Sequence, residues 1–472
     1  MKTNMFSGVL FIGGSQSIRV VLNLATIAVL ARFVTSEEFG LIAVLTTISL
    51  IANYFGEFGL SVSIIRHQGR GLKRVANLVF WWTLIFSSVI GLGLYLTSGL
   101  VGDVLKNDEL TKIISIAALL YPIVAMRSAH KAFVERMLRF KLIAVIEVSG
   151  AVVSAVVATV LAVNGAGVWA LLAQQYALSI FLAVAYFTFS GFRPSWPRDL
   201  LNVKELFSFG GQLTAYQLTS IVGNYSDRPI ILRFQGAESL GYYSVGNQLI
   251  QFLVMHISSA VQRVMLPSMS SMRDDLGHMR EAYCRVFYAV CLVMLPSMVG
   301  LSLVSEEFVL LFLGEDWKRT GEIVKWNALA GPFLAVNWLN YTILLILGRI
   351  RTQLIFGLVQ ATATIAAFLI GSAYSIELVV KLYFAVIFVF SIALYIFISK
   401  MLSIETMAQI KNIFILLLSV TAMTFSVLML SRWVDGSTLF RFVCLVGVGG
   451  GVFMAIEFIF ERRKLLGLIR AK

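Results

Sequence analysis

The sequence of 472 residues has little charge and little cysteine. Charged residues make up 13% of it and hydrophobic residues 58%, whereas a soluble domain carries about 25% charged residues. An ordinary soluble protein is therefore excluded. The three cysteines, Cys284, Cys291 and Cys444, lie in apolar stretches without CxxC or Cys/His spacing, so we expect neither a metal site nor a disulfide framework.

Several functional motifs are also missing. The sequence has no GxxxxGK[ST] motif, no long loop with clustered carboxylates and no nucleophile–base constellation, so we predict a protein that is not an enzyme and uses no cofactor. The first apolar run, Met5 to Phe33, is too long for a signal peptide and lacks a cleavage site. We expect this run to stay in the protein as its first membrane span.

Long apolar runs fill most of the chain. A membrane-spanning helix needs about 20 apolar residues, and a window of about 19 residues finds about fourteen such spans. They lie near 6–33, 40–65, 75–99, 110–131, 142–163, 167–189, 206–234, 239–265, 282–304, 319–347, 352–371, 376–398, 411–431 and 438–460. The sequence therefore predicts an all-α polytopic membrane protein.

The connections between these spans alternate in charge. One set, which includes His67 to Arg74 and Lys131 to Lys141, is basic, whereas the other, which includes Thr35 to Phe39 and Ser305 to Trp317, is acidic or neutral. This is the positive-inside pattern, which places both termini in the cytoplasm. The net charge of +13 then reflects topology, so we expect no nucleic-acid partner.

An internal repeat divides the chain. At an offset of 201 residues, Arg32, Phe33, Glu37 and Gly40 match Arg233, Phe234, Glu238 and Gly241. Because the repeat is displaced by six helices, the two halves should have the same orientation. We predict an N-lobe over 1–190, a cytoplasmic linker over 191–205, a C-lobe over 206–400, and a C-terminal helix pair with a basic tail over 401–472.

Polar residues form a stripe on the first predicted helix. Their spacings of three, four and three place Gln16, Arg19, Asn23 and Thr26 on one face. The repeat gives Gln217, Ser220, Asn224 and Asp227 on the seventh helix. Lipid cannot satisfy such groups, so each stripe should face its counterpart or a water-filled cavity. Hydrogen bonding that only holds helices together is the other interpretation.

Ionisable residues also occur inside the predicted spans. The basic ones are Arg19, Arg127, Arg228, Arg263 and Lys325, and the deepest acidic ones are Glu57 and Asp227, with Glu147 and Glu457 near predicted cytoplasmic ends. The excess of cations suggests an anionic passenger, since guanidinium binds phosphate in a bidentate way. Glu57 or Asp227 would then bind a coupling proton or sodium ion. Ion pairs of structural role, such as Arg19 with Glu57 or Asp227 with Arg228, and snorkelling cations are the alternatives.

Several motifs resemble one known family. LARFVTSEEFGLIAV (Leu30 to Val44), FGEFGLSVSIIRHQ (Phe55 to Gln68) and NYSDRPIILRFQGAESLGYYSVGNQL (Asn224 to Leu249) are similar to bacterial polysaccharide transporters, the Wzx-type oligosaccharide flippases of the MATE-like (MOP) superfamily. The likeness covers nearly the whole chain and favours the branch of colanic acid and teichuronic acid exporters. The Arg228-Pro229 pair departs from the pattern expected after the aspartate.

The resemblance implies a function and a site. It implies a fourteen-helix flippase that carries an undecaprenyl-diphosphate-linked oligosaccharide from the cytoplasmic to the periplasmic leaflet by alternating access, with polysaccharide polymerase or assembly proteins as partners. The central-cavity candidates are Gln16, Arg19, Asn23, Arg127, Asn224, Arg263 and Lys325, and the apolar helices of Lys411 to Phe460 would form a groove for the lipid tail. The alternatives are a cation-coupled multidrug or small-metabolite exporter of the MATE type and, less favoured, a non-transporting scaffold.

Overall fold

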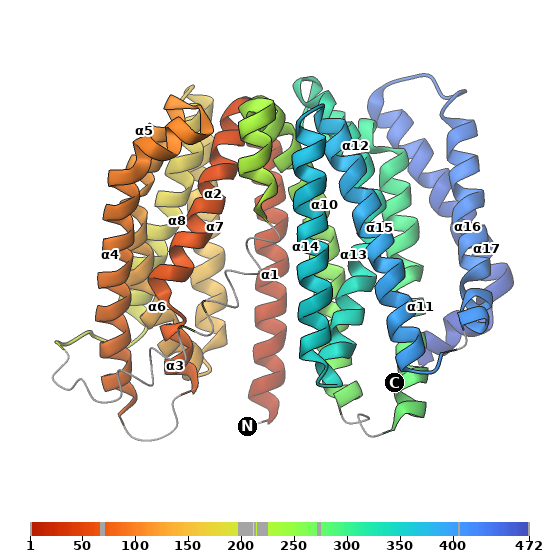
Figure 1. The fold of residues 1–472 in the computed structure, drawn as a ribbon, viewed down its shortest axis with the longest axis horizontal. Coiled ribbons are helices and arrows are strands. Elements are labelled where there is room, and N and C mark those ends of the chain that lie inside the picture. The colour runs from red at the N-terminus through yellow and green to blue at the C-terminus, as the bar shows by residue number, and fades with distance from the viewer. Residues whose placement is uncertain are drawn as a thin grey trace. The chain divides into compact units, whose positions relative to one another are not determined.

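The computed structural model describes residues 2–66, 71–196, 211, 214, 225–270, 275–404 and 406–470. Helices and their connections make up these residues, and no strand occurs among them (Figure 1). The chain divides into two compact units, Met1–Gly241 and Tyr242–Lys472. The all-α class predicted from the sequence is therefore confirmed.

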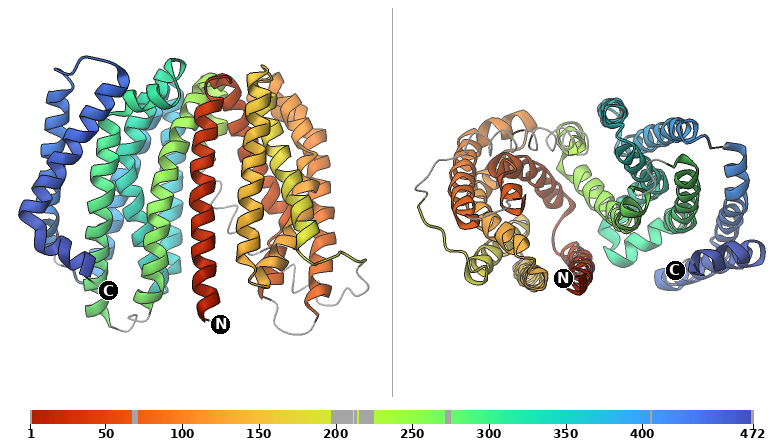
Figure 2. Two further views of the ribbon diagram at one scale, coloured as in Figure 1. Left: turned by 180° about the vertical axis from the view of Figure 1, so that it is seen from behind. Right: turned by 90° about the horizontal axis from the view of Figure 1, so that it is seen from below.

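The first unit is a bundle of long helices that run up and down, joined by short connections (Figure 2). Its helices are α1 (Lys2–Leu30), α2 (Ser36–Glu57), α3 (Leu60–Arg66), α4 (Leu72–Leu105), α5 (Asp108–Ala117), α6 (Leu120–Arg136), α7 (Phe140–Val163) and α8 (Val168–Phe189), followed by the beginning of α10 (Asp227–Ser270). Within this unit α7 packs against both α1 and α8, and α6 packs against α4 and α8. Helix α7 therefore lies between α1 and α8.

The second unit contains the rest of α10 and the remaining helices. These are α11 (Leu276–Leu303), α12 (Ser305–Phe312), a 3₁₀ turn (Glu315–Trp317), α13 (Lys318–Ile346), α14 (Ile350–Ser372), α15 (Ile376–Met401), α16 (Thr406–Leu430) and α17 (Thr438–Arg470). Helices α16 and α17 pack as a pair. The surface between α16 and α17 is less apolar than the sequence suggested. The buried Glu457 of α17 accepts a hydrogen bond there from Ser419 of α16 at 3.0 Å.

Twelve helices among the described residues are long and apolar enough to cross a membrane. This number is consistent with the predicted fourteen, since most of the predicted span 206–234 lies outside the described residues and the span 239–265 falls within α10. The division into lobes at 191–205 stays a prediction for the same reason.

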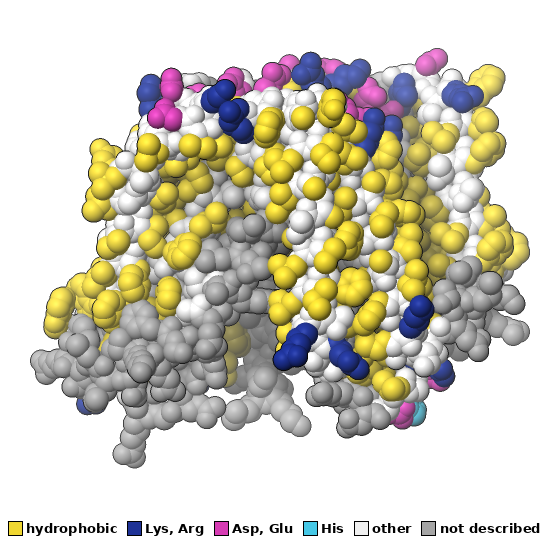
Figure 3. Space-filling view, in the orientation of Figure 1, with side chains coloured by type: hydrophobic (Ala, Val, Ile, Leu, Met, Phe, Trp, Pro, Cys, Tyr) yellow, Lys and Arg dark blue, Asp and Glu magenta, His cyan; other side chains and the backbone are white. Residues whose placement is uncertain are grey.

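The outer faces of the helices are apolar. On α4, Val89, Leu92, Leu96 and Leu100 are each more than half exposed, which is the arrangement expected of side chains in contact with lipid. In the space-filling view the face over α14 and α15 is apolar along most of its length, with basic side chains near the lower ends of these helices (Figure 3). The protein is therefore a multi-pass membrane protein.

Two predicted segments have a different structure. The predicted span 40–65 is broken between α2 and α3, where Phe58 and Gly59 adopt left-handed backbone conformations with φ of 44° and 61°. A hydropathy window cannot detect this break, because it measures polarity and not backbone conformation. The predicted connection 305–317 contains α12 and the 3₁₀ turn, which ends at the buried Trp317.

The internal repeat is visible in the helix boundaries. Helix α2 begins at Ser36, after its N-cap Thr35. Helix α10 is interrupted at Gly236, where φ is 82° and ψ is 172°, so its second part begins at Ala237. Ser36 and Ala237 are separated by the offset of the sequence repeat, which the structure therefore confirms at this point.

Candidate functional site

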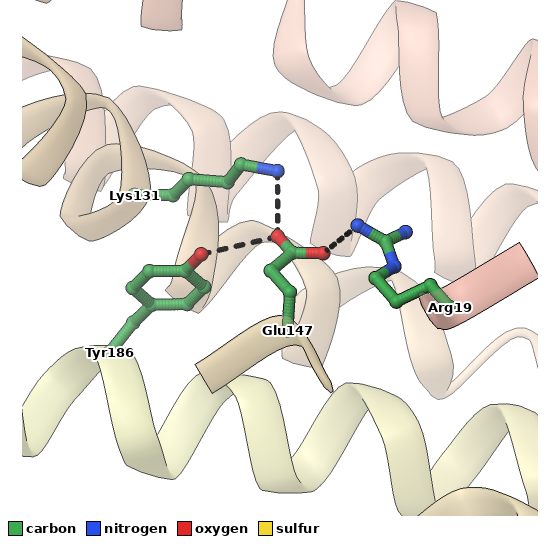
Figure 4. A network of polar contacts seen from close by, with 4 residues as sticks. All are labelled: Arg19, Lys131, Glu147 and Tyr186. Carbon is green, nitrogen blue, oxygen red and sulfur yellow. Dashed lines mark hydrogen bonds and ion pairs between the residues drawn. The ribbon is translucent and has the colours of Figure 1, made fainter. Parts of the chain in front are cut away.

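Four helices of the first unit meet around one carboxylate, that of Glu147 on α7 (Figure 4). The Arg19 guanidinium of α1 lies 2.6 Å from Glu147 Oε2. The Lys131 ammonium of α6 lies 2.8 Å from Glu147 Oε1, and the Tyr186 hydroxyl of α8 donates to the same oxygen at 3.1 Å. We call these four residues the Glu147 network.

Apolar packing fixes the position of Glu147. The neighbouring Ile146 belongs to a buried cluster with Leu182 and Tyr186 of α8 and Val134 of α6. Because Tyr186 is a member of both the cluster and the network, the packing of α7 on α8 also sets the position of the phenol beside the carboxylate. The Glu147 side chain is 7% exposed, and such a buried carboxylate is stable in its charged form only if its oxygens are paired.

The two cations are more open than the carboxylate that holds them. The side chains of Arg19 and Lys131 are 41% and 38% exposed. A guanidinium has five N–H donors and an ammonium three, so the bonds to Glu147 leave donors on both groups. The Glu147 network therefore presents two adjacent cations, held from behind by a buried anion, which suits the binding of a phosphate group.

Further charges surround the network. Glu57 of α2 lies within the electrostatic influence of Arg127, Lys131 and Glu135 of α6. Glu147 in turn lies within that of Arg127. Because Arg127, Lys131 and Glu135 are spaced four residues apart, they share one face of α6. Charged groups of both signs therefore lie near the Glu147 network.

The structure gives Arg19 another partner than the one suggested by the sequence. The suggested pair was Arg19 with Glu57, whereas the pair observed is Arg19 with Glu147. Sequence reasoning missed Lys131 and Tyr186 as site residues, and it noted Glu147 only as an acid near a helix end. The spacing of Lys131 four residues after Arg127 was the available signal.

The other residues of the predicted stripe on α1 differ in their environments. Gln16 and Asn23 are exposed, on the side of α1 that also carries Arg19. Thr26 is buried and its hydroxyl donates to the Leu22 carbonyl of its own helix at 2.7 Å. Thr26 is thus satisfied within α1, and the polar part of the stripe narrows to Gln16, Arg19 and Asn23.

The structure places Asp227 and Arg228 at the start of α10. Asp227 is 3% exposed, and its carboxylate accepts from the Arg228 amide at 2.9 Å. The Arg228 guanidinium donates to the Ala43 carbonyl at 3.1 Å and to the Thr47 hydroxyl at 3.3 Å, both on α2. Arg228 therefore connects α10 to α2.

The remaining candidates lie elsewhere. Lys325 of α13 is exposed and lies 3.5 Å from Glu322, one turn earlier on its own helix. Gln217, Ser220, Asn224 and the side chain of Arg263 lie outside the described residues. Within the part of the chain that is described, no group of three or more His, Cys, Asp or Glu side chains could hold a metal ion.

Solved structures share the fold. The lipid II flippase MurJ in an inward closed conformation superposes with a TM-score of 0.80 at 14% identity, over 97% of this chain and 100% of that one. A multidrug resistance MATE family transporter in an inward-facing conformation gives a TM-score of 0.61 at 15% identity, over 82% of this chain and 94% of that one. The chain therefore shares the fold of these two proteins.

Relatives by sequence point to one group of proteins. The lipopolysaccharide biosynthesis protein WzxC of Escherichia coli (strain K12) is 24% identical over 79% of this chain and 76% of the relative. The succinoglycan biosynthesis transport protein ExoT of Rhizobium meliloti (strain 1021) is 25% identical over 74% and 71% of the two chains. The teichuronic acid biosynthesis protein TuaB of Bacillus subtilis (strain 168) is 23% identical over 70% and 68%. The family model described as "Polysaccharide biosynthesis protein" matches residues 29–322, and the chain therefore belongs to this family of polysaccharide biosynthesis proteins.

Proposed function

We propose that the protein is a flippase that moves an oligosaccharide linked to undecaprenyl diphosphate from the cytoplasmic to the periplasmic leaflet of the bacterial inner membrane. The oligosaccharide is a building block of a surface polysaccharide, and both termini of the protein lie in the cytoplasm. Membership of the polysaccharide biosynthesis family and a fold shared with a lipid II flippase support this proposal.

One observation links the proposed function to particular residues. Arg19 and Lys131 are half-exposed cations, inside helices of membrane-spanning length, that share one buried carboxylate. A cation inside a membrane span is costly unless it is paired, and the pair with Glu147 offsets this cost while it leaves donors free on both cations. In our proposal Arg19 and Lys131 bind the diphosphate of the lipid carrier with the donors that Glu147 leaves free, and Arg127 contributes its charge nearby.

The pairing of Glu147 with both cations suits a carrier that must release its cargo. Arg19 and Lys131 are bound to the Glu147 carboxylate before any substrate enters. A diphosphate therefore competes with Glu147 for Arg19 and Lys131. This competition limits the affinity of the site, because a carrier that held the diphosphate with unopposed cations would release it slowly.

The two ends of the substrate call for different surroundings. A sugar and a diphosphate need polar partners, which Gln16, Arg19 and Asn23 on one side of α1 offer. The polyprenyl chain is apolar and can stay in the lipid during transport. We propose that the head group passes through the protein by alternating access and that the protein makes and breaks no covalent bond of the substrate.

Mass spectrometry of lipid extracts tests this function. A strain that lacks the protein should accumulate undecaprenyl-diphosphate oligosaccharides while its surface polysaccharide disappears, and expression of the unaltered protein should reverse both changes. Normal amounts of the lipid-linked intermediates together with an intact surface polysaccharide would contradict the proposal and favour a multidrug or metabolite exporter.

A further inference from the structure

Two segments related by the sequence repeat touch each other in the structure. Gly40 lies in the second turn of α2, and its repeat partner Gly241 lies near the start of the second part of α10. A Cβ atom on Gly40 would overlap the carbonyl oxygen of Ala237 and would lie 3.0 Å from the Gly241 amide nitrogen. All these residues belong to the first compact unit.

The contact is reciprocal. A Cβ atom on Gly241 would overlap the carbonyl oxygen of Ser36 and would lie 3.0 Å from the Ser36 Cα. Each glycine thus packs against the residue that lies four positions before its repeat partner. A contact in which both partners use the same surface has local twofold symmetry, so the repeat is expressed in this contact as well as in the sequence.

Positions 40 and 241 require glycine because the two helical segments approach each other closely, and not because of their backbone conformation. Neither glycine has a positive φ, whereas the atoms that a Cβ would meet belong to the backbone and cannot move aside as a flexible side chain would. Glycine inside a helix is less favourable than alanine by about 1 kcal/mol. Small residues allow membrane helices to approach at such crossings. Separation of the two segments also requires that Arg228 release Ala43 and Thr47 of α2.

We propose that this glycine contact is a gate, which is closed in this conformation and opens during the transport cycle. The inference rests on the proposed alternating access, in which the ends of repeat-related segments must part on one side of the membrane. The contact lies at the connections Thr35 to Phe39 and Gln235 to Ser239, which the charge pattern assigns to the extracytoplasmic side.

Glu38 ties the α2 side of the gate to the rest of the first unit. Its carboxylate accepts from the amide and hydroxyl of Thr35 at the start of α2. It also accepts from the Val168 amide at the start of α8 at 2.8 Å. The start of α2 therefore moves together with α8, so the opening of the gate displaces the segment of α10 relative to this pair.

Larger side chains at the two glycines test the gate. In a protein whose three cysteines are replaced by alanine, Asn23→Cys reports access from outside through its reaction with a membrane-impermeant maleimide. Gly40→Leu and Gly241→Leu should each raise the labelling rate, because the gate can no longer close. The matched control is Gly93→Leu in α4, where an added Cβ would meet nothing within 4 Å. If a folded leucine variant is labelled at the same rate as the control, the proposal of a gate is contradicted.

A cross-link tests the gate without altering the glycines. Glu37 and Glu238 are exposed and are related by the repeat, so Glu37→Cys and Glu238→Cys can be joined by a short cleavable thiol cross-linker. The joined protein should lose transport and regain it when the linker is cleaved. Full transport by the joined protein, or failure of the linker to form, would contradict the gate. The labelling of Asn23→Cys does not depend on the cargo. If the leucine variants alter the labelling rate but leave the surface polysaccharide unchanged, the proposed gate stands and the proposed flippase function is contradicted.

Discussion

Arg19 and Glu147 form an ion pair between α1 and α7, with 2.6 Å between Nη1 and Oε2. The pair is asymmetric, since the arginine side chain is 41% exposed and the glutamate side chain 7% exposed. The buried partner has a supporting role, whereas the open partner can meet a substrate. This difference leads to the first prediction.

Exchanging the charges separates a structural role of Arg19 from substrate binding. Arg19→Glu alone should abolish transport. Arg19→Glu combined with Glu147→Arg should form an ion pair between positions 19 and 147 again but should not restore transport, because the cation then lies at the buried position and Lys131 has lost its anion. Thermal unfolding in detergent reports the pair, and the lipid-linked oligosaccharide content of cells reports transport. Recovery of transport in the double variant would show that Arg19 has only a structural role.

Removal of the charge of Glu147 should strengthen substrate binding and slow turnover. In Glu147→Gln, Arg19 and Lys131 lose their internal anion, so a diphosphate meets less competition. We expect more lipid-linked oligosaccharide to copurify with this variant, together with a loss of stability of about 1–2 kcal/mol, less than for a fully buried pair because the cations are half exposed.

Glu457→Gln is the matched control for this prediction. Glu457 is also buried and hydrogen-bonded, but it lies in the second unit, where Ser419 is a partner. Its replacement should lower stability without raising the amount of bound lipid. Equal retention of lipid by both variants would show that Glu147 has no particular relation to the substrate.

Tyr186→Phe should destabilise the protein by about 1.5–3 kcal/mol, the usual contribution of a hydrogen bond to a charged group. The hydroxyl donates to Glu147 at 3.1 Å within a buried environment. Tyr176→Phe is a suitable comparison, because that hydroxyl donates to the neutral carbonyl of Ile116 at 2.6 Å and its loss should cost about 0.5–1.5 kcal/mol. Thermal unfolding of both variants provides the measurement, and a larger loss for Tyr176→Phe would contradict the assignment.

The segment after α8 offers a prediction about local stability. Asn77 of α4 donates to the Ser195 hydroxyl at 2.6 Å and accepts from the Ser195 amide at 3.1 Å, and the Trp81 indole donates to the Ser195 carbonyl at 3.0 Å. Asn77→Ala should therefore release this segment and accelerate hydrogen exchange of the Ser195 amide. Asn164→Ala, which removes a bond to Val160 of the same helix turn, should leave this exchange rate unchanged.

The long apolar runs and the repeat made the fold predictable. Runs such as 142–163 and 376–398 end within a few residues of α7 and α15, because length and polarity decide which segments can cross a membrane. The break at Phe58 and Gly59 was not predictable in this way, since it depends on the sign of two backbone angles.

The candidate site was only partly predictable from the sequence. Helical spacing placed Gln16, Arg19 and Asn23 on one side of α1, and the structure agrees. Spacing within one helix cannot tell which neighbouring helix lies opposite, so Glu57 was suggested as the partner of Arg19 where the packing of α1 on α7 brings Glu147. Lys131 was assigned to a connection because a basic residue near a helix end usually marks the cytoplasmic interface.

Transport in reconstituted vesicles tests the central claim most directly. Purified protein is placed in liposomes that contain the lipid-linked oligosaccharide extracted from the strain lacking it, and a membrane-impermeant oxidant then measures the fraction of sugar exposed outside. With the unaltered protein this fraction should rise toward the whole pool, whereas with the variant carrying Arg19→Glu and Glu147→Arg it should stay at the value for protein-free liposomes. An equal rise for both proteins, or no rise with the unaltered protein, would contradict the proposal that the protein moves this lipid-linked sugar by means of Arg19.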